Sequence, residues 1–422
     1  MLFSDEIRAT RRLSGIYRLA VTGLILISAL ILPSAPVFSA DDTLLVTHET
    51  QGSLETEIEK ALNEHIDRAG KSSDIKTLEI AAKVNLSGSG GGVDDNLSGD
   101  WGFLYNLREA SSLDNITNLK ITGAGVTEIP NFALFNARVG CPWLKNLEIP
   151  NITRIGEAAF VLCKELESVV IASGEDKASI RTIEAGAFSE SGIKSFTIPA
   201  SVTDIGRSAF SSCKRLKSVT FESGAKFSKI PFGMLSESGI ESAVIPESVK
   251  IIDNGAFFGC ADLREITFEG ASSLELISND AFCRSGVESI VIPAPVRTIG
   301  DSAFWLCKNL ASVTFAGVSS LESLGEGSFS GIAAKSLTLP PSLTHIADGA
   351  FYECENLKEI VFSAAAPPKF EGTDIFAKTA IESIIIPHGT GETYKPALES
   401  AGWTGDVKES EKPPAKQPES LS

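Results

Sequence analysis

Residues 202–221 read VTDIGRSAFSSCKRLKSVTF, and residues 249–268 read VKIIDNGAFFGCADLREITF. The same pattern stands in ITRIGEAAFVLCKELESVVI at 152–171, VRTIGDSAFWLCKNLASVTF at 296–315 and LTHIADGAFYECENLKEIVF at 343–362. A second pattern lies between these segments: IRTIEAGAFSESGIKSFTIP at 180–199, FSKIPFGMLSESGIESAVIP at 227–246, LELISNDAFCRSGVESIVIP at 274–293 and LESLGEGSFSGIAAKSLTLP at 321–340. The two patterns alternate in steps near 25 and 22 residues, which gives a double period of 47 residues over most of the array.

One unit shows why such a sequence must stack. Its recurring apolar positions are Ile205, Phe210, Leu216, Val219 and Phe221. The last two alternate with Ser218 and Thr220, which is the period-2 pattern of a short strand. The Ile-Gly-x-x-Ala-Phe part does not alternate, and we expect one short helical turn there, on the opposite, convex wall. A single unit would leave its apolar edge in water, whereas stacked units share one core with strands about 4.8 Å apart. Repeats of this length and spacing predict a leucine-rich-repeat solenoid that is rich in β-structure.

The cysteines fit the same geometry. Five of the seven lie three residues after the repeat phenylalanine of the first pattern: Cys163, Cys213, Cys260, Cys307 and Cys354. Consecutive members would lie two coils apart, roughly 10 Å, which is beyond the reach of a disulfide. We therefore expect buried free thiols that act as small apolar residues, and no metal site. Cys141 and Cys283 lie off this column, and a bridge from either to a column member stays open.

The repeated unit also carries a family resemblance. The pattern x-I-G-x-x-A-F-x-x-C-x-x-L-x-x-V-x-I-P over residues 126–387 resembles the BspA-like, or treponemal-type, leucine-rich repeats. Ile386-Pro387, followed by Tyr394 and Trp403, is similar to the closing unit of that family. The resemblance implies an exported or surface protein that binds host matrix proteins or other cells. Sorting or immunoglobulin-like modules, which many relatives carry, are not recognisable here, and the mode of surface attachment stays open.

The ends of the chain suggest further segments. Residues 1–40 combine four arginines, an apolar run at 19–32 and small residues at 37–40, which predicts a signal peptide and an exported protein, at the cell surface, secreted or periplasmic. An uncleaved anchor helix is the alternative, although 14 residues fall short of the roughly 20 that a span needs. We expect a small α/β N-terminal cap at 41–125, with an amphipathic helix at 54–66, a strand at 75–86 and a second helix from residue 100. A C-terminal cap is expected at 388–407 and a disordered tail at 408–422.

Catalytic chemistry is hard to find in the sequence. The net charge of −17 argues against nucleic acid and anionic lipid as partners. The four histidines, His48, His65, His345 and His388, belong to no recognisable triad or metal motif. The acidic, glycine-rich loop at 90–100 could hold calcium, but a flexible loop is favoured because the EF-hand spacing is missing. We predict no cofactor, no metal and no enzymatic activity. Asn85, Asn96, Asn115 and Asn151 stand in glycosylation sequons, whose use depends on an organism that the sequence does not name.

The outer face of the predicted strands is the best candidate for function. Small hydroxyl side chains dominate it, bordered by charges of both signs, and we predict partner binding there, on a concave surface, at Ser195, Thr197, Ser218, Thr220, Glu265, Thr267, Ser289, Ser312, Thr314, Ser336 and Thr338. The competing interpretation is that serine and threonine merely suit an exposed strand. We expect a monomer whose partner is a protein or glycan of a host or neighbouring cell, and no small-molecule substrate. A structural or scaffolding component of the cell envelope is the alternative function.

Overall fold

The computed structural model describes residues 43–48, 54–69, 75–82, 104, 107, 113, 115–122, 125–136, 139–149, 152–171, 180–270 and 272–411. The expected signal peptide, the loop at 90–100 and the sequons at Asn85, Asn96 and Asn151 lie outside these residues, and Asn115 is exposed. The description below concerns the unit Phe38–Ser422. None of the helices in the described part is long and apolar enough to cross a membrane.

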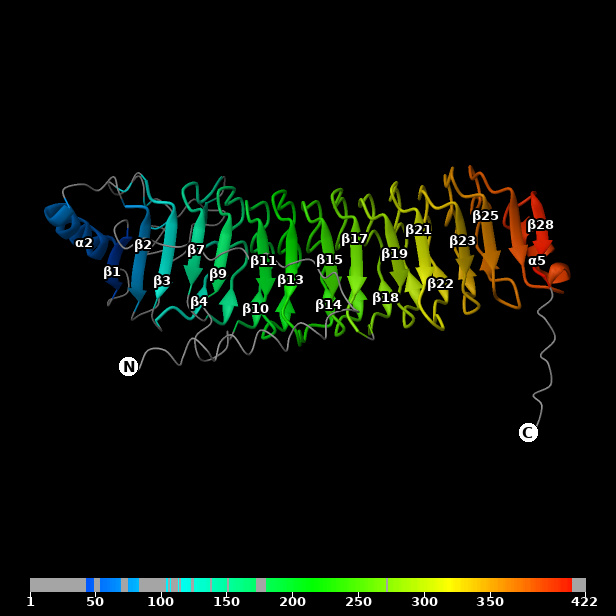
Figure 1. The fold of residues 1–422 in the computed structure, drawn as a ribbon, viewed down its shortest axis with the longest axis horizontal. Coiled ribbons are helices and arrows are strands. Elements are labelled where there is room, and N and C mark those ends of the chain that lie inside the picture. Colours follow the sequence, from blue (N-terminus) through cyan, green and yellow to red (C-terminus); the bar gives the residue numbers. More distant parts are fainter. Residues whose placement is uncertain are drawn as a thin grey trace, which may run out of the picture. The chain divides into compact units, whose positions relative to one another are not determined.

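One wall of the solenoid consists of parallel strands that follow one another in chain order (Figure 1). They are β1 (Thr43–His48), β2 (Thr77–Ala82), β3 (Asn118–Thr122), β7 (Asn146–Ile149), β9 (Ser168–Ile171), β11 (Ser195–Ile198), β13 (Ser218–Phe221), β15 (Ser242–Ile245), β17 (Glu265–Phe268), β19 (Ser289–Ile292), β21 (Ser312–Phe315), β23 (Ser336–Leu339), β25 (Glu359–Phe362), β27 (Ser383–Ile386) and β28 (Asp406–Glu409). They form three sheets, β1–β9, β11–β21 and β23–β28. We call the outer surface of this wall the strand face. The predicted solenoid of leucine-rich repeats is confirmed.

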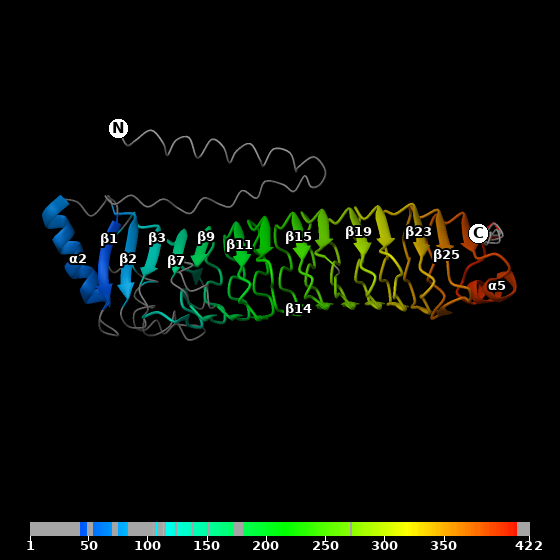
Figure 2. The same ribbon diagram turned by 60° about the horizontal axis from the view of Figure 1, so that its bottom comes forward.

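A second wall of two-residue parallel strands runs beside the first (Figure 2). Its members are β4 (Glu128–Ile129), β8 (Arg154–Ile155), β10 (Thr182–Ile183), β12 (Asp204–Ile205), β14 (Lys229–Ile230), β16 (Ile251–Ile252), β18 (Leu276–Ile277), β20 (Thr298–Ile299), β22 (Ser323–Leu324), β24 (His345–Ile346) and β26 (Lys369–Phe370). In most of them the second residue is buried and the first faces outward, as with Ile205 and Asp204. These strands could not be predicted from the sequence, because two residues are too few to show the alternation of apolar and polar side chains that marks a strand. A small antiparallel pair, β5 (Phe135–Asn136) and β6 (Val139–Gly140), stands apart from both walls.

The third side, expected to hold short helical turns, is built of tight turns instead. We call it the turn wall, and it comprises residues 156–163, 184–191, 206–213, 231–238, 253–260, 278–285, 300–307, 325–332 and 347–354. Here the backbone N–H of Phe188 donates to the carbonyl of Ala209 in the next coil at 2.8 Å. Two residues per coil, four apart, adopt left-handed backbone conformations, for example Ser208 (φ 55°) and Ser212 (φ 57°). The helical expectation was wrong because alternate N–H groups, such as those of Gly186, Phe188 and Glu190, pair with the next coil. In a helix, the N–H groups pair within their own segment.

Stacked aromatic rings and thiols fill the core. The rings of Phe282 and Phe304 stack at 5.2 Å and those of Phe304 and Phe329 at 5.2 Å, both nearly parallel. All seven cysteines are buried and free, as expected for the column. The column thiols also donate to the carbonyl of the preceding coil, for example Cys260 Sγ to Leu235 O at 3.0 Å and Cys307 Sγ to Phe282 O at 3.0 Å. They therefore tie neighbouring coils together in addition to filling space.

The first end of the array is closed by a helix. Helix α2 (Leu54–Ala69) confirms the amphipathic helix, and it buries Leu54, Ile58 and Leu62. The strands in the expected N-terminal cap, β1, β2 and β3, pair in register and continue into β7. The second helix expected from residue 100 falls almost wholly outside the described residues.

The other end is closed by helix α5 (Gly391–Ser400) and by β28, which pairs with β27. The hydroxyl of Tyr394 donates to the carbonyls of Ala364 at 2.8 Å and Ala366 at 3.1 Å. The ring of Trp403 packs edge-on against Phe376 at 5.9 Å. Strand β28 extends two residues, to Glu409, into the disordered tail that we expected to begin at 408. Residues 412–422 lie outside the described part.

Candidate functional site

The predicted binding residues all lie on the strand face. Ser195, Ser218 and Thr220 are half-buried, and the other eight are exposed. Their inward neighbours are buried, for instance Val219 and Ile290, because successive side chains of a strand point to opposite faces.

The structure brings these residues together in short rows. Glu265, Ser289 and Ser312 are consecutive register partners across β17, β19 and β21. Thr197 and Thr220 face each other with their hydroxyl oxygens 2.9 Å apart. The rows are interrupted before Ser336 and Thr338, because β21 and β23 belong to different sheets.

Pairing between the strands alternates between complete and minimal. The pairs β11–β13, β15–β17, β19–β21 and β23–β25 are in register over four residues. The pairs β13–β15 and β17–β19 share only one register position, at the start of the strands. Connections of seven residues follow β13, β17 and β21, at 222–228, 269–275 and 316–322, whereas five residues follow β15, β19 and β23. The strands thus form doublets, and neighbouring doublets separate toward their C-terminal ends.

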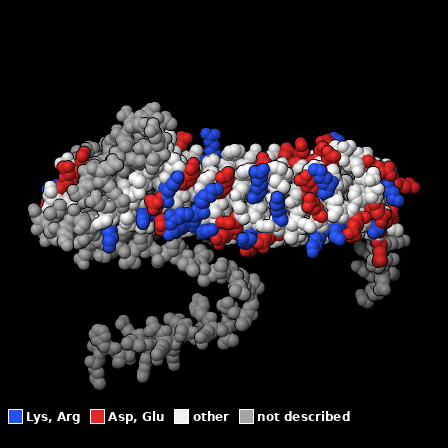
Figure 3. All heavy atoms as spheres, turned by 90° about the horizontal axis from the view of Figure 1, so that it is seen from above, with Lys and Arg blue, Asp and Glu red and all other residues white. Residues whose placement is uncertain are grey.

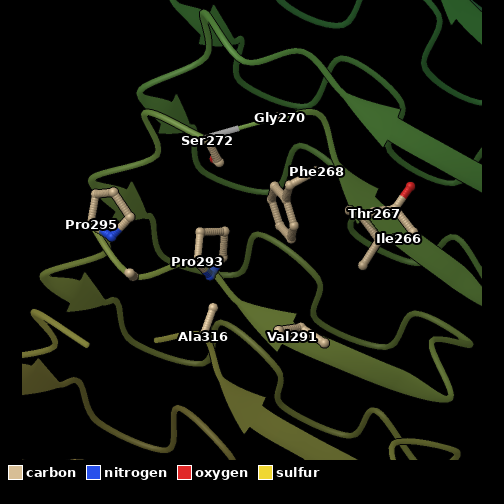
Figure 4. A pocket seen from close by; sticks show the side chains of 10 residues that line it. Ile266, Thr267, Phe268, Gly270, Ser272, Val291, Pro293, Pro295 and Ala316 are labelled. Carbon is tan, nitrogen blue, oxygen red and sulfur yellow. The ribbon is translucent and has the colours of Figure 1, made fainter. Parts of the chain in front are cut away.

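An apolar pocket opens between the separated ends of β17 and β19. It has a volume of ≈ 510 Å³, and its wall is mainly carbon. Figure 4 shows Pro293 in the middle, with Phe268, Val291, Pro295 and Ala316 around it. Val291 is 54% exposed, which is unusual for a valine on a well-packed strand. A pocket of this size and lining suits an apolar side chain of a partner.

A second pocket repeats this arrangement 47 residues further on. Its volume is ≈ 580 Å³, and Phe315 and Pro340 take the places of Phe268 and Pro293. Thr338 replaces Val291 and Ser363 replaces Ala316, so this pocket is more polar. Four predicted residues line it, namely Ser312, Thr314, Ser336 and Thr338, and Thr267 lines the first pocket.

The outward hydroxyl residues were predicted from the sequence, but the two pockets were not. A signal was present, since Gly-x-Ser recurs at 270–272 and 317–319, and a proline follows each strand of the second pattern. The phenylalanines of the pockets are the last residues of β17 and β21, and the prolines lie in the connections that follow β19 and β23.

Charged side chains border the strand face where the strands begin, and most of them pair across coils. Lys217 pairs with Glu241 at 3.0 Å, Arg264 with Glu288 at 2.9 Å, and Lys358 with Glu382 at 2.9 Å. Figure 3, which looks onto the array from this side, shows both signs interspersed. Lys194 and Arg215 both contact Glu167, and the hydrogen bond from Lys194 lowers the pKa of this carboxyl group. The charges therefore largely satisfy one another, which leaves the hydroxyls and the pockets to meet a partner.

Reactive groups lie apart from one another and from this face. His48 is buried against Glu57 at 2.7 Å, whereas His345 and His388 lie near Glu371 and Glu409 on other coils. Burial raises the pKa of the column thiols, which disfavours the nucleophilic thiolate. Within the ranges that the structure describes, no group of three or more His, Cys, Asp or Glu side chains could hold a metal ion.

Comparison with known proteins identifies the family. The model of the BspA type leucine-rich repeat region matches in six copies, over residues 127–264, 181–310 and 275–400. No curated protein matches the chain. Proteins with these repeats are in general interaction or adhesion-type proteins, and leucine-rich-repeat proteins are typically non-catalytic.

Solved structures with some likeness include the pneumococcal vaccine antigen PcpA, at 17% identity and a TM-score of 0.44, with 80% of each chain covered. A leucine-rich repeat protein from Bacteroides ovatus shows 22% identity and a TM-score of 0.41, over 70% of this chain and 84% of that one. A leucine-rich cell surface protein from Faecalibacterium prausnitzii shows 20% identity and a TM-score of 0.36, over 78% and 83%. The family match itself covers well over half of the sequence, and the chain therefore belongs to the BspA-type leucine-rich repeat family.

Proposed function

We propose that this protein is a non-enzymatic, exported binding protein that attaches to a protein of a host or neighbouring cell through its strand face. The observation that carries the proposal is the apolar pocket at Phe268, Val291 and Pro293, which opens within a surface of exposed hydroxyl groups. Protein interfaces commonly combine an apolar centre with a polar rim. The strand face offers both elements on a rigid scaffold.

The pocket supplies the anchor in this proposal. A partner side chain such as leucine or phenylalanine would displace water from Val291 and Pro293, and the hydroxyls of Thr267 and Ser272 would meet its polar neighbours at the rim. Binding energy at interfaces concentrates in such pockets. Since the second pocket repeats the geometry two coils away, an extended segment with two spaced apolar residues would engage both.

Several observations support a role without catalysis. The column thiols are buried and protonated at neutral pH, and the histidines lie on separate elements. The strand-face charges are committed to pairs between coils. Membership of the repeat family supports an exported location and an interaction role.

The test measures binding of purified full-length protein to immobilised extracellular-matrix proteins and to host-cell surface extracts by biolayer interferometry. Val291→Lys places a charge in the pocket and should weaken binding by at least about tenfold. Thr344→Lys, an exposed change at the residue before β24, serves as the matched control and should leave binding unchanged. Equal binding by both variants would contradict the proposal that the partner binds the strand face.

Cell fractionation separates this function from a scaffold of the envelope. Digestion of the protein by protease on intact cells supports a surface-exposed adhesin. Complete protection, together with no binding to any host preparation, would favour the structural role instead.

A further inference from the structure

A groove crosses the turn wall at the coil formed by residues 325–332. At the position of Gly331, the equivalent coils of the second pattern carry Glu190, Glu237 and Arg284. The missing side chain leaves a trough that Leu306 borders, with its Cδ2 atom 3.0 Å from where a Cβ atom at 331 would lie.

Two aromatic side chains form the walls of this trough. Trp305 belongs to the coil before it and Tyr352 to the coil after it, and both are half-buried. In the core directly beneath, the ring of Phe329 lies 5.2 Å from that of Phe304 and 6.3 Å from that of Phe351. One coil thus separates the two wall coils, and Trp305 and Tyr352 line the same pocket above it.

Each wall ring is backed by a cation on its outer side. Arg284, from the coil preceding Trp305, lies over the indole at 5.0 Å. Lys378, from the coil following Tyr352, lies over the phenol ring at 4.7 Å and pairs with Glu353 at 2.9 Å. These contacts restrain the two rings, and both residues line the pocket between the coils.

Polar groups surround the space between the rings. The pocket there has a volume of ≈ 280 Å³, and Glu326, Asp348 and Asp374 line it. Asp348 is held in place by the N–H of Asp374, which donates to its Oδ1 at 2.9 Å. On the other side of Gly331 the trough continues into a polar pocket of ≈ 330 Å³ that includes Asn356.

We propose that this groove, the turn-wall groove, binds a neutral oligosaccharide. The aliphatic face of a pyranose ring stacks on aromatic side chains, and its hydroxyls donate hydrogen bonds to carboxylates such as Glu326 and Asp374. An anionic ligand would be repelled by these carboxylates. A cationic ligand would be repelled by Arg284 and Lys378, which lie against the same two rings and offset the charge of the carboxylates. The volume of ≈ 280 Å³ fits one sugar ring, and the adjoining pocket fits the next.

The turn-wall groove lies on a different wall from the strand face, and the proposal does not depend on the proposed function. Full-length protein would be titrated with chitotetraose, cellotetraose, maltotetraose and mannotetraose, with tetralysine and a heparin tetrasaccharide as charged probes. Isothermal calorimetry and saturation-transfer NMR give the affinities. At least one neutral probe should bind with a Kd of about 1 mM or tighter.

Two variants locate the site. Gly331→Arg fills the trough with the residue that stands at 284, where the backbone has the same left-handed conformation (φ 57° against 71°). It should lower the affinity at least about tenfold, as should Tyr352→Ala. Glu190→Arg makes the matched change on another coil and should leave the affinity unchanged. Val291→Lys should also leave it unchanged, which separates this site from the strand face.

Three results would overturn the proposal: no binding of any neutral probe at about 5 mM, full affinity retained in folded Gly331→Arg and Tyr352→Ala, or binding of a charged probe alone. Circular dichroism of each variant shows whether it is folded.

Discussion

Replacing Gly239 by alanine should disrupt the contact between two coils far more than its small size suggests. A Cβ atom at this position would lie 2.2 Å from the carbonyl oxygen of Lys214 and 2.9 Å from its carbon, both backbone atoms of the preceding coil. Relief needs a shift of the coil by about 1 Å, and such a shift lengthens the hydrogen bond from the Gly239 N–H to Cys213 O, now 3.1 Å. Overpacking costs about 1–3 kcal/mol and the weakened hydrogen bond about 1 kcal/mol, so we expect a loss of about 2–4 kcal/mol.

The array contains its own precedent for this change. Ala333 occupies the equivalent position four residues after Phe329, and its N–H donates to Leu310 O instead of to the cysteine carbonyl. A side chain at this position therefore goes together with a changed hydrogen bond between the coils, which is the distortion that we expect at 239.

Guanidinium unfolding followed by circular dichroism gives the free energies. Gly186→Ala is the control: its left-handed backbone (φ 60°) penalises alanine by about 1 kcal/mol, but the nearest atom, Ser189 Cβ, is 3.9 Å away. Hydrogen exchange should rise at β13 and β15 in Gly239→Ala only. Equal losses of stability in the two variants would refute the argument that inter-coil backbone contact sets the cost.

Other residues give further predictions. Phe304→Ala removes a fully buried ring stacked on two neighbours and should lower the free energy of unfolding in urea by about 3–5 kcal/mol. Leu235→Ala, which breaks no ring stack, should lower it by less, and the reverse order would contradict the role of stacking. In the native protein at pH 8, iodoacetamide should leave the column thiols unmodified, because burial raises the pKa of Cys260 and of Cys307 to about 12; mass spectrometry of alkylated peptides tests this. Since these pKa values lie above the ordinary thiol value, the contribution of the thiols to the free energy of unfolding is complete below about pH 9. It should decline as the pH rises toward 12, and a denaturation midpoint that increases over this range would contradict the prediction. Tyr394→Phe leaves the carbonyls of Ala364 and Ala366 without their donor and should lower the free energy of unfolding by about 1–3 kcal/mol. A Tm equal to that of the wild type would contradict this prediction.

Much of the fold was predictable because each unit repeats the same local information. The spacing of Phe210 and Cys213, repeated at 257 and 260, fixed the stacking and placed the thiols too far apart to pair. Alternation at Ser218–Phe221 fixed which side chains face outward, and hence the hydroxyl rows of the candidate surface.

The remaining features depend on contacts between coils, which no single unit encodes. Ser208 and Ser212 adopt left-handed conformations because their coil pairs with its neighbours, so the expected helical turn does not form. The separation of β17 from β19 arises from unequal connections on either side, and it opens the pocket around Val291. The turn-wall groove lies over a coil with small residues at 327 and 331, between coils that carry Trp305 and Tyr352. Sequence alone determined the repeat, the core and the outward residues through spacing and burial, while the pockets were decided by the backbone approach of one coil to the next, which only the tertiary structure contains.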